Sequence, residues 1–87
     1  MKISVYDTYV QRPDGLHMHF DILVPSELKH IETILGFGRT YLAAKGLPSE
    51  ILEAEKCNYC HMESAGSAVE EEIEATGFAI LEMENCS

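Results

Sequence analysis

The sequence lacks a long apolar run, and this absence bears on where the protein acts. No stretch of its 87 residues approaches the roughly 18 consecutive apolar residues that a membrane span needs. The N-terminus, MKISVYDTYV, alternates like a strand and lacks the apolar block of a signal peptide. We therefore expect a mature chain that begins at Met1 and stays in the cytoplasm.

Basic residues are nearly absent from the second half of the chain. After residue 46 the only one is Lys56, whereas glutamates are frequent. The charges of residues 1–46 cancel, so the net charge of −9 resides in residues 47–87. Because such a surface repels polyanions, the sequence predicts no nucleic-acid partner and no membrane partner.

Prolines and cysteines are also few, with three of each. Because 46% of the residues are hydrophobic, the chain is expected to fold as a globular protein rather than remain disordered. A chain this short buries too little surface for two cores, so we expect a single domain over residues 1–87. An odd cysteine count argues against a closed disulfide framework, which leaves reduced thiols available as ligands or nucleophiles.

Two segments near the N-terminus have the composition of β-strands. Residues 3–10 and 16–24 are rich in β-branched and aromatic side chains, and the second alternates strictly at its start. Between them, Pro13 opens a type I turn and Gly15 supplies its left-handed position. The pattern predicts a β-hairpin with a three-residue loop.

The remaining pattern predicts the order ββαβαβ. Gly36 and Gly38 lie within the first helical stretch, where they let the helix lie close to the sheet or mark a bend. The expected elements are a helix from a Ser26 cap to Gly46, a short strand at 50–57 that leads into a CNYCH loop, a helix from the capping box Ser67–Glu70 to Thr76, and a last strand from Phe78 to Met83.

This order predicts a two-layer α+β fold. The N-terminal hairpin belongs to a mixed sheet of about four strands, and both helices pack on one face because right-handed crossovers place successive helices on the same side. The other face of the sheet is then exposed to solvent, covered by loops or paired with a second copy of the chain. A homodimer through this free face is therefore one expectation.

The hairpin loop sets the strand register, and the register gathers polar residues on one face. Asp7 comes to lie directly opposite Asp21, and two facing carboxylates repel unless a proton, a metal, a cation or a histidine compensates them. Carboxylates, imidazoles and a phenol can bind a metal or exchange protons near neutral pH. The candidate ligand-binding residues are Asp7, Tyr9, His17, His19 and Asp21. An ordinary solvent-facing polar surface is the alternative.

The stretch Cys57-Asn58-Tyr59-Cys60-His61 is the second candidate site. The CxxCH pattern is typical of a site for covalent attachment of a c-type haem, which is expected in exported proteins. Its two cysteines could also form a dithiol redox centre, which needs its first cysteine at a helix N-terminus. Neither condition is met, because no export signal precedes the motif and the next helix begins only at the Ser67 cap.

A zinc ion remains as a candidate cofactor of this stretch. A two-residue spacer lets both thiolates reach one tetrahedral ion, and a remote histidine of the hairpin or Cys86 fits better than the adjacent His61 as a further ligand. The open alternative is that the thiols only pack within the fold. The candidate metal ligands are Cys57, Cys60, His61 and Cys86.

Several segments together resemble a known family. YDTYV, MHFDILVP, YLAAKG, the CxxCH stretch and a final strand that runs to MENC are similar to a small bacterial family catalogued only as a domain of unknown function. The resemblance covers nearly the whole chain and implies an autonomous α+β domain in bacteria that carries the CxxCH stretch. It brings no established activity, substrate or cofactor, so it assigns no catalytic residue.

Two functional hypotheses follow. The first is a cytoplasmic, non-enzymatic binding module, with its site where the polar face of the hairpin meets the CNYCH stretch and the C-terminal cysteine. The second is a small enzyme or thiol redox protein that uses Asp7, His19 and Asp21, or Cys57 and Cys60. An enzyme should enclose these side chains in a concave pocket, whereas a flat face is typical of a partner surface.

Overall fold

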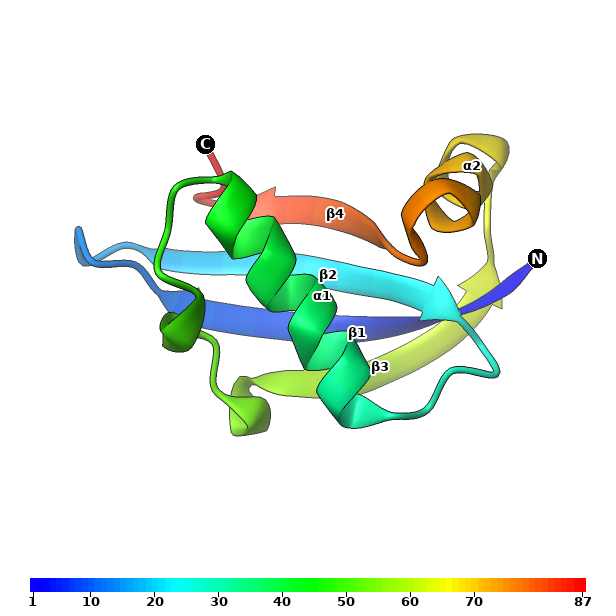
Figure 1. Cartoon of the computed structure of the whole chain (residues 1–87), viewed down its shortest axis with the longest axis horizontal. Coiled ribbons are helices and arrows are strands. Elements are labelled where there is room, and N and C mark those ends of the chain that lie inside the picture. Colours follow the sequence, from blue (N-terminus) through cyan, green and yellow to red (C-terminus); the bar gives the residue numbers. More distant parts are fainter.

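The computed structural model describes all residues, 1–87, as an α+β fold (Figure 1). The elements are β1 (Lys2–Gln11), β2 (His17–Pro25), α1 (Ile31–Ala44), two 3₁₀ turns η1 (Ser49–Ile51) and η2 (Ala54–Lys56), β3 (Cys57–Ser64), α2 (Ser67–Thr76) and β4 (Ala79–Glu84). The predicted α+β class and the order ββαβαβ are confirmed. Neither helix has the length and apolar character needed to cross a membrane.

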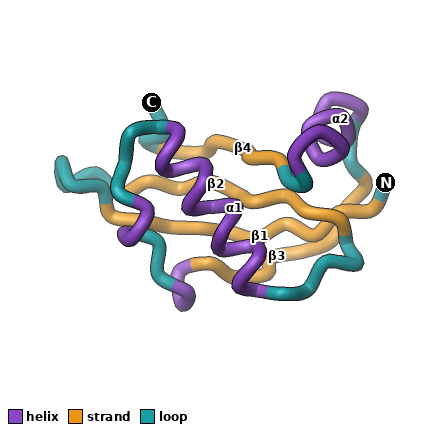
Figure 2. The backbone as a smooth tube through the Cα atoms, in the orientation of Figure 1, coloured by secondary structure: helices purple, strands orange, loops and turns teal.

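The four strands form one sheet in the order β3-β1-β2-β4, so the hairpin strands lie at its centre (Figure 2). All three pairings are antiparallel. The predicted mixed sheet is therefore wrong, because β3 and β4 each join the outer edge of a hairpin strand in the opposite direction. This topology leaves β3 and β4 at opposite edges.

The hairpin has the register that its turn predicts. The Arg12 N–H donates to the Leu16 carbonyl at 2.8 Å, and the Gly15 N–H donates to the Arg12 carbonyl at 2.9 Å. Gly15 adopts a φ of 89°, which an L side chain rarely adopts. The turn thus fixes Asp7 opposite Asp21.

The helix α1 covers one face of the sheet and builds the larger core with it. It crosses in front of β1 and β2 in Figure 1. Gly38 permits the close approach, because a Cβ at this position would lie only 2.6 Å from Leu52 Cδ2. The buried residues of this core are Val10, Met18, Phe20, Ile22, Val24, Ile34, Leu35, Leu42, Leu52, Cys57 and Cys86.

The helix α2 packs on the opposite face, so the predicted placement of both helices on one face is wrong. Ile73 of α2 contacts a second cluster that includes Val5 and Leu23. The handedness rule behind the prediction governs parallel strands, whereas α2 connects β3 to β4 across the whole sheet and these strands are antiparallel. Because α2 lies at the end of the sheet near the N-terminus, it leaves the rest of this face uncovered (Figure 2).

Three local predictions also differ from the structure. The first helix begins at Ile31 with His30 as its N-cap, because the Ser26 N–H donates to the Lys2 carbonyl and prolongs the hairpin ladder. Ser67 makes no side-chain cap, since Gly66 occupies the N-cap position of α2. Residues 50–57, predicted as a strand, form mainly the 3₁₀ turns η1 and η2.

The CNYCH stretch itself is also different from the prediction. It begins the edge strand β3, whereas the sequence pattern predicted a loop. Tyr59 and Cys60 are exposed within this strand. The motif is therefore presented by a sheet, and strand alternation decides which way each side chain points.

Candidate functional site

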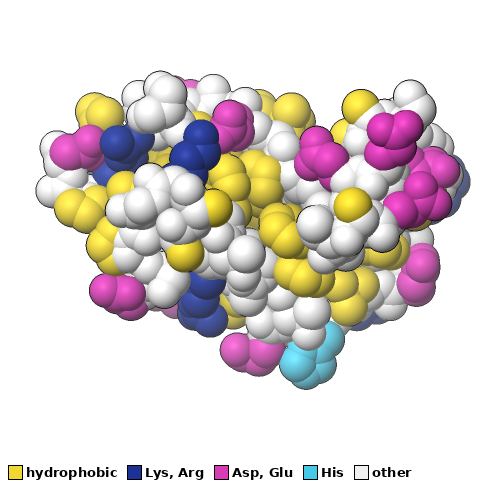
Figure 3. Space-filling view, turned by 45° about the horizontal axis from the view of Figure 1, so that its top comes forward, with side chains coloured by type: hydrophobic (Ala, Val, Ile, Leu, Met, Phe, Trp, Pro, Cys, Tyr) yellow, Lys and Arg dark blue, Asp and Glu magenta, His cyan; other side chains and the backbone are white.

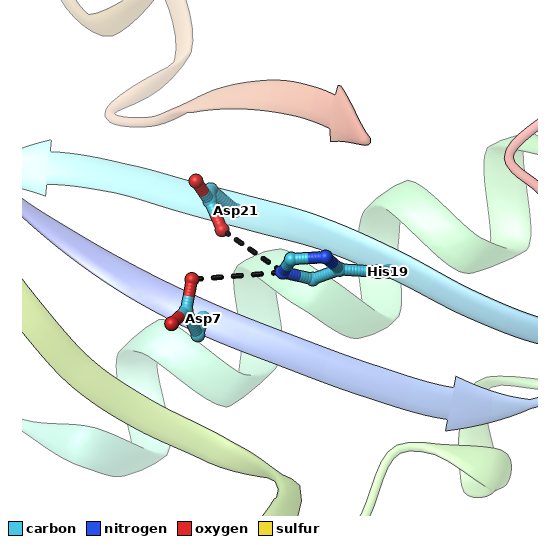
Figure 4. Close-up of side chains that lie close together, drawn as sticks. All are labelled: Asp7, His19 and Asp21. Atoms are coloured by element: carbon cyan, nitrogen blue, oxygen red, sulfur yellow. Dashed lines mark ion pairs between the residues drawn. The ribbon is translucent and has the colours of Figure 1, made fainter. Parts of the chain in front are cut away.

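Three polar side chains of the hairpin converge on the sheet face that α1 does not cover. Asp7 lies on β1, and His19 and Asp21 lie on β2, with the imidazole directed toward both carboxylates (Figure 4). The backbone bond between residues 12 and 16 makes Asp7 and Asp21 a non-hydrogen-bonded pair, the type in which opposite side chains are closest. The predicted facing carboxylates are thus real neighbours.

The distances within this cluster are longer than those of hydrogen bonds. His19 Nε2 lies 3.5 Å from Asp21 Oδ1 and 3.6 Å from Asp7 Oδ1. Both His19 Nε2 and Asp21 Oδ1 are buried and have no hydrogen-bond partner. A buried polar atom without a partner costs about 1–3 kcal/mol. The fold therefore holds these two atoms in place at an energetic cost.

Burial and neighbouring charges give the two carboxyl groups different pKa values. Desolvation, together with the neighbouring Asp7, raises the pKa of Asp21 to about 6. Interaction with the neighbouring Asp21 carboxyl group, and weaker interactions with Cys60 and His19, lower the pKa of Asp7. The carboxyl group of Asp7 is thus ionised under mildly acidic conditions, whereas that of Asp21, with its pKa of about 6, ionises nearer to neutral pH.

Tyr9 fixes the plane of the imidazole. Its ring stacks on that of His19 with a centroid distance of 4.2 Å and an interplanar angle of 12°. Tyr9 is 48% exposed, whereas the His19 side chain is 15% exposed, so the phenol ring shields the imidazole from solvent. Of the predicted ligand-binding residues, Tyr9 therefore supports the cluster from the side.

Strand alternation in β3 places Cys60 on the sheet face that carries Asp7, next to a β-bulge. Val5 pairs with His61 and Tyr6 pairs with Tyr59, which leaves Cys60 as the extra residue. Partial desolvation and the carboxylates of Asp7 and Asp21 raise the pKa of Cys60. The thiol thus lies within the electrostatic reach of both hairpin carboxylates. The sequence-based hypothesis placed the CNYCH stretch beside the polar face of the hairpin, although it predicted a loop there rather than a strand.

The four predicted metal ligands do not meet at one point. Cys57 lies opposite Thr8 on the α1 side of the sheet, where it accepts a hydrogen bond from the Thr8 hydroxyl at 3.5 Å. Cys86 follows the opposite edge strand and donates to the His19 carbonyl at 3.3 Å. Cys60 and His61 remain together, with Sγ 3.2 Å from Nδ1. Strand alternation, which separates Cys57 from Cys60, explains why the CxxC spacing does not form a site.

A shallow cavity of about 440 Å³ lies beside the cluster. His17, predicted as a ligand, lines it near the hairpin end and does not join the cluster. Sequence reasoning also missed Glu50, Glu53 and Lys56 of the 3₁₀ turns, which line the same cavity. Asp7, His19 and Asp21 lie outside it, so they face an open part of the sheet.

The uncovered face and the acidic surface bear on the predicted partners. Val5 and Leu23 are buried under α2 with exposures of 1% and 4%, so they offer no apolar partner surface. Acidic side chains gather over α2 (Figure 3). The homodimer through the free sheet face stays a prediction.

The fold and the cluster define a small α+β domain with an antiparallel sheet and a polar site on its open face. The family model described as "Domain of unknown function (DUF2024)" matches residues 1–83. The chain therefore belongs to this family. The resemblance to a family of unknown function that the sequence suggested is confirmed at this level.

One solved structure is similar to the whole chain. It is the NMR structure of protein NE1680 from Nitrosomonas europaea, a structural genomics target. The two proteins are 35% identical over 100% of each chain, with a TM-score of 0.84. No curated protein gives a significant match. The comparisons thus support the fold and the family and name no activity.

Proposed function

We propose that this protein is a cytoplasmic, non-enzymatic module that binds a divalent metal ion through Asp7, His19 and Asp21. The observation that carries the proposal is that two buried atoms 3.5 Å apart, His19 Nε2 and Asp21 Oδ1, have no hydrogen-bond partner. Asp21 is only 7% exposed, so solvent does not satisfy it. A metal ion accounts for both atoms at once, because an imidazole nitrogen and a carboxylate oxygen are common metal ligands.

The spacing of the ligand atoms supports this proposal. One atom from each of the three side chains lies within 4.8 Å of the other two. Ligands on a tetrahedral zinc ion with bonds of about 2.0–2.1 Å are separated by about 3.4 Å. The separations of 3.5 and 3.6 Å from His19 Nε2 are close to this value.

The same geometry favours binding over catalysis. None of the three cluster residues lines the cavity, whereas an enzyme site usually encloses its reacting groups in a concave pocket. The thiol redox alternative also loses support. Cys57 and Cys60 point to opposite faces, and burial raises the pKa of Cys57 while desolvation and nearby carboxylates raise that of Cys60.

The proposal predicts stoichiometric zinc binding that depends on the hairpin cluster. In calorimetric titration with zinc chloride, the wild-type protein should bind one equivalent. His19→Gln should weaken binding by about 100-fold or more, because it removes the nitrogen ligand while it keeps a polar side chain of similar size.

Glu74→Gln is the matched control for this experiment. Glu74 is an exposed residue of α2 and is not one of the three cluster residues, so its replacement lowers the negative charge of the protein without removing a ligand. Zinc affinity should stay within about twofold of wild type. Equal affinities of the wild-type and His19→Gln proteins would show that zinc binds elsewhere, and an absence of binding to the wild type would refute the proposal.

A further inference from the structure

We infer that the cavity at the hairpin end binds a free basic amino acid, of the lysine or arginine type, as a ligand separate from the metal ion. Its charged contacts are Glu50, Glu53 and Lys56, which line the cavity. None of them belongs to the metal-binding cluster, so the inference does not depend on the proposed metal site.

The size of the cavity suits one small molecule. Its volume of about 440 Å³ lies near the lower end of the range of about 300–1,000 Å³ that is common for small-molecule sites. Its walls come from segments far apart in the chain, the hairpin end with Tyr9 and the 3₁₀ turns η1 and η2. The volume is enough for a single amino acid.

The charged side chains of the cavity are free to bind a ligand. Glu50, Glu53 and Lys56 are exposed, and none of them takes part in an ion pair of the protein. Two carboxylates and one ammonium group complement a ligand with two positive charges and one negative charge. A free basic amino acid has this combination in its α-ammonium group, its side-chain cation and its carboxylate.

The uncharged part of the lining matches the aliphatic stem of such a ligand. Val10 is buried and Ile51 is half-buried, and both line the cavity. The methylene groups of a basic side chain cover apolar surface of this kind while its charged end stays with polar groups. The ring of Tyr9, which is 48% exposed, adds an aromatic surface that attracts cations.

The segment that carries the three charged residues is fixed to the rest of the fold. Leu52, between the two glutamates, belongs to the larger core and is 1% exposed. Arg39 Nη2 donates to the Leu52 carbonyl at 3.2 Å, and the Lys56 N–H donates to the Glu53 carbonyl at 3.0 Å. A preorganised lining lowers the entropy cost of binding, because the segment does not have to become ordered around the ligand.

The charge of the protein opposes the alternative of an anionic ligand. The net charge of −9 resides in residues 47–87, which include both cavity glutamates. Such a field raises the local concentration of cations and repels anions. A ligand with a net positive charge, which lysine and arginine have, is therefore favoured.

Titration of chelator-treated protein with L-lysine tests the inference. Calorimetry should show saturable binding of one equivalent. Glu50→Gln and Glu53→Gln should each weaken it roughly tenfold, because each removes one charge-assisted contact. Lys56→Met should weaken lysine binding by a similar factor but strengthen the binding of 1,5-diaminopentane, which has both cations of lysine and lacks its carboxylate. All three side chains are exposed, so these variants keep the fold.

Norleucine and Glu74→Gln are the matched controls. Norleucine has the aliphatic stem of lysine without the terminal ammonium group, so it should bind at least roughly tenfold more weakly. Glu74 does not line the cavity, and its replacement lowers the negative charge of the protein by the same amount as either cavity variant. Lysine affinity of Glu74→Gln should stay within about twofold of wild type.

Three results would overturn the inference: no saturable lysine binding, equal affinities for lysine and norleucine, or lysine binding that none of the cavity variants changes. Lysine that binds only when zinc is present would lie on the metal ion rather than in the cavity and would overturn it as well. Diamine binding as tight as lysine binding and insensitive to Lys56→Met would overturn the assignment to an amino acid. Zinc binding that depends on His19 is measured without lysine, so the two proposals fail separately.

Discussion

Replacing Asp21 with asparagine should stabilise the metal-free protein at about pH 7.5 and abolish its response to zinc. Asp21 is buried, and its pKa of about 6 lies above the ordinary value of 3.8. Ionising a group whose folded-state pKa is raised opposes folding, so stability is highest below about pH 4 and falls as the pH rises to about 6. An uncharged side chain avoids this loss.

The expected size of the effect follows from the pKa difference. The ionised carboxylate costs at most about 3 kcal/mol above pH 6. Urea unfolding of chelator-treated protein at about pH 7.5 should therefore show Asp21→Asn to be about 1–3 kcal/mol more stable than wild type. Near pH 4 the two proteins should differ little, because Asp21 is largely protonated there in the folded state and partly protonated in the unfolded chain.

Zinc should reverse the order of stabilities. A ligand that binds only the folded state at about 1,000 times its Kd stabilises that state by about 4.1 kcal/mol, which the wild type gains and the variant does not. Glu74→Gln is again the control, since removal of an exposed charge should change stability by only a few tenths of a kcal/mol. A metal-free Asp21→Asn protein that is less stable than wild type at pH 7.5 would argue that the aspartate is a structural group rather than a ligand.

Valine at position 38 should destabilise the protein by about 3 kcal/mol, whereas alanine at position 36 should stabilise it by about 1 kcal/mol. A Cβ at Gly38 would lie 2.6 Å from Leu52 Cδ2 and 3.0 Å from Ile22 Cδ1. Both neighbours are fully buried with exposures of 1% and 0%, so they have no room to move aside. The helix α1 would have to lift from the sheet.

Gly36 provides a matched comparison within the same helix. A Cβ there meets no atom within 4 Å, so alanine brings only its higher helix propensity. Thermal unfolding should lower the Tm of Gly38→Val by more than about 10 °C and raise that of Gly36→Ala by a few degrees. Equal Tm values for wild type and Gly38→Val would mean that α1 does not depend on close contact with Leu52.

The pairing of the site residues was predictable because they lie within one hairpin. The Pro13-Asp14-Gly15 loop fixes the register through two local backbone bonds, and the register places Asp7 opposite Asp21 and Tyr9 opposite His19. These contacts depend on residues close in sequence. The burial of Asp21 and the missing hydrogen-bond partner of His19 were not predictable, since they depend on how neighbouring strands cover the hairpin.

The CNYCH stretch shows the opposite case. Its spacing suggested two thiolates on one ion, yet alternation along β3 sends Cys57 to the core and Cys60 to the face of Asp7. This alternation follows from the pairing of β3 with β1, a strand far away in the sequence, whereas the local pattern predicted a loop.

The sequence by itself determined the hairpin with its register, the helical nature of α1 and α2, and the α+β class, because turn chemistry and hydrophobic periodicity act over a few residues. Only the tertiary structure decided that α2 crosses to the face opposite α1 and that β3 joins β1 with a bulge. These choices depend on how apolar surfaces distant in the chain bury one another. They decide what surrounds Asp7, His19 and Asp21, where we propose that the metal ion binds.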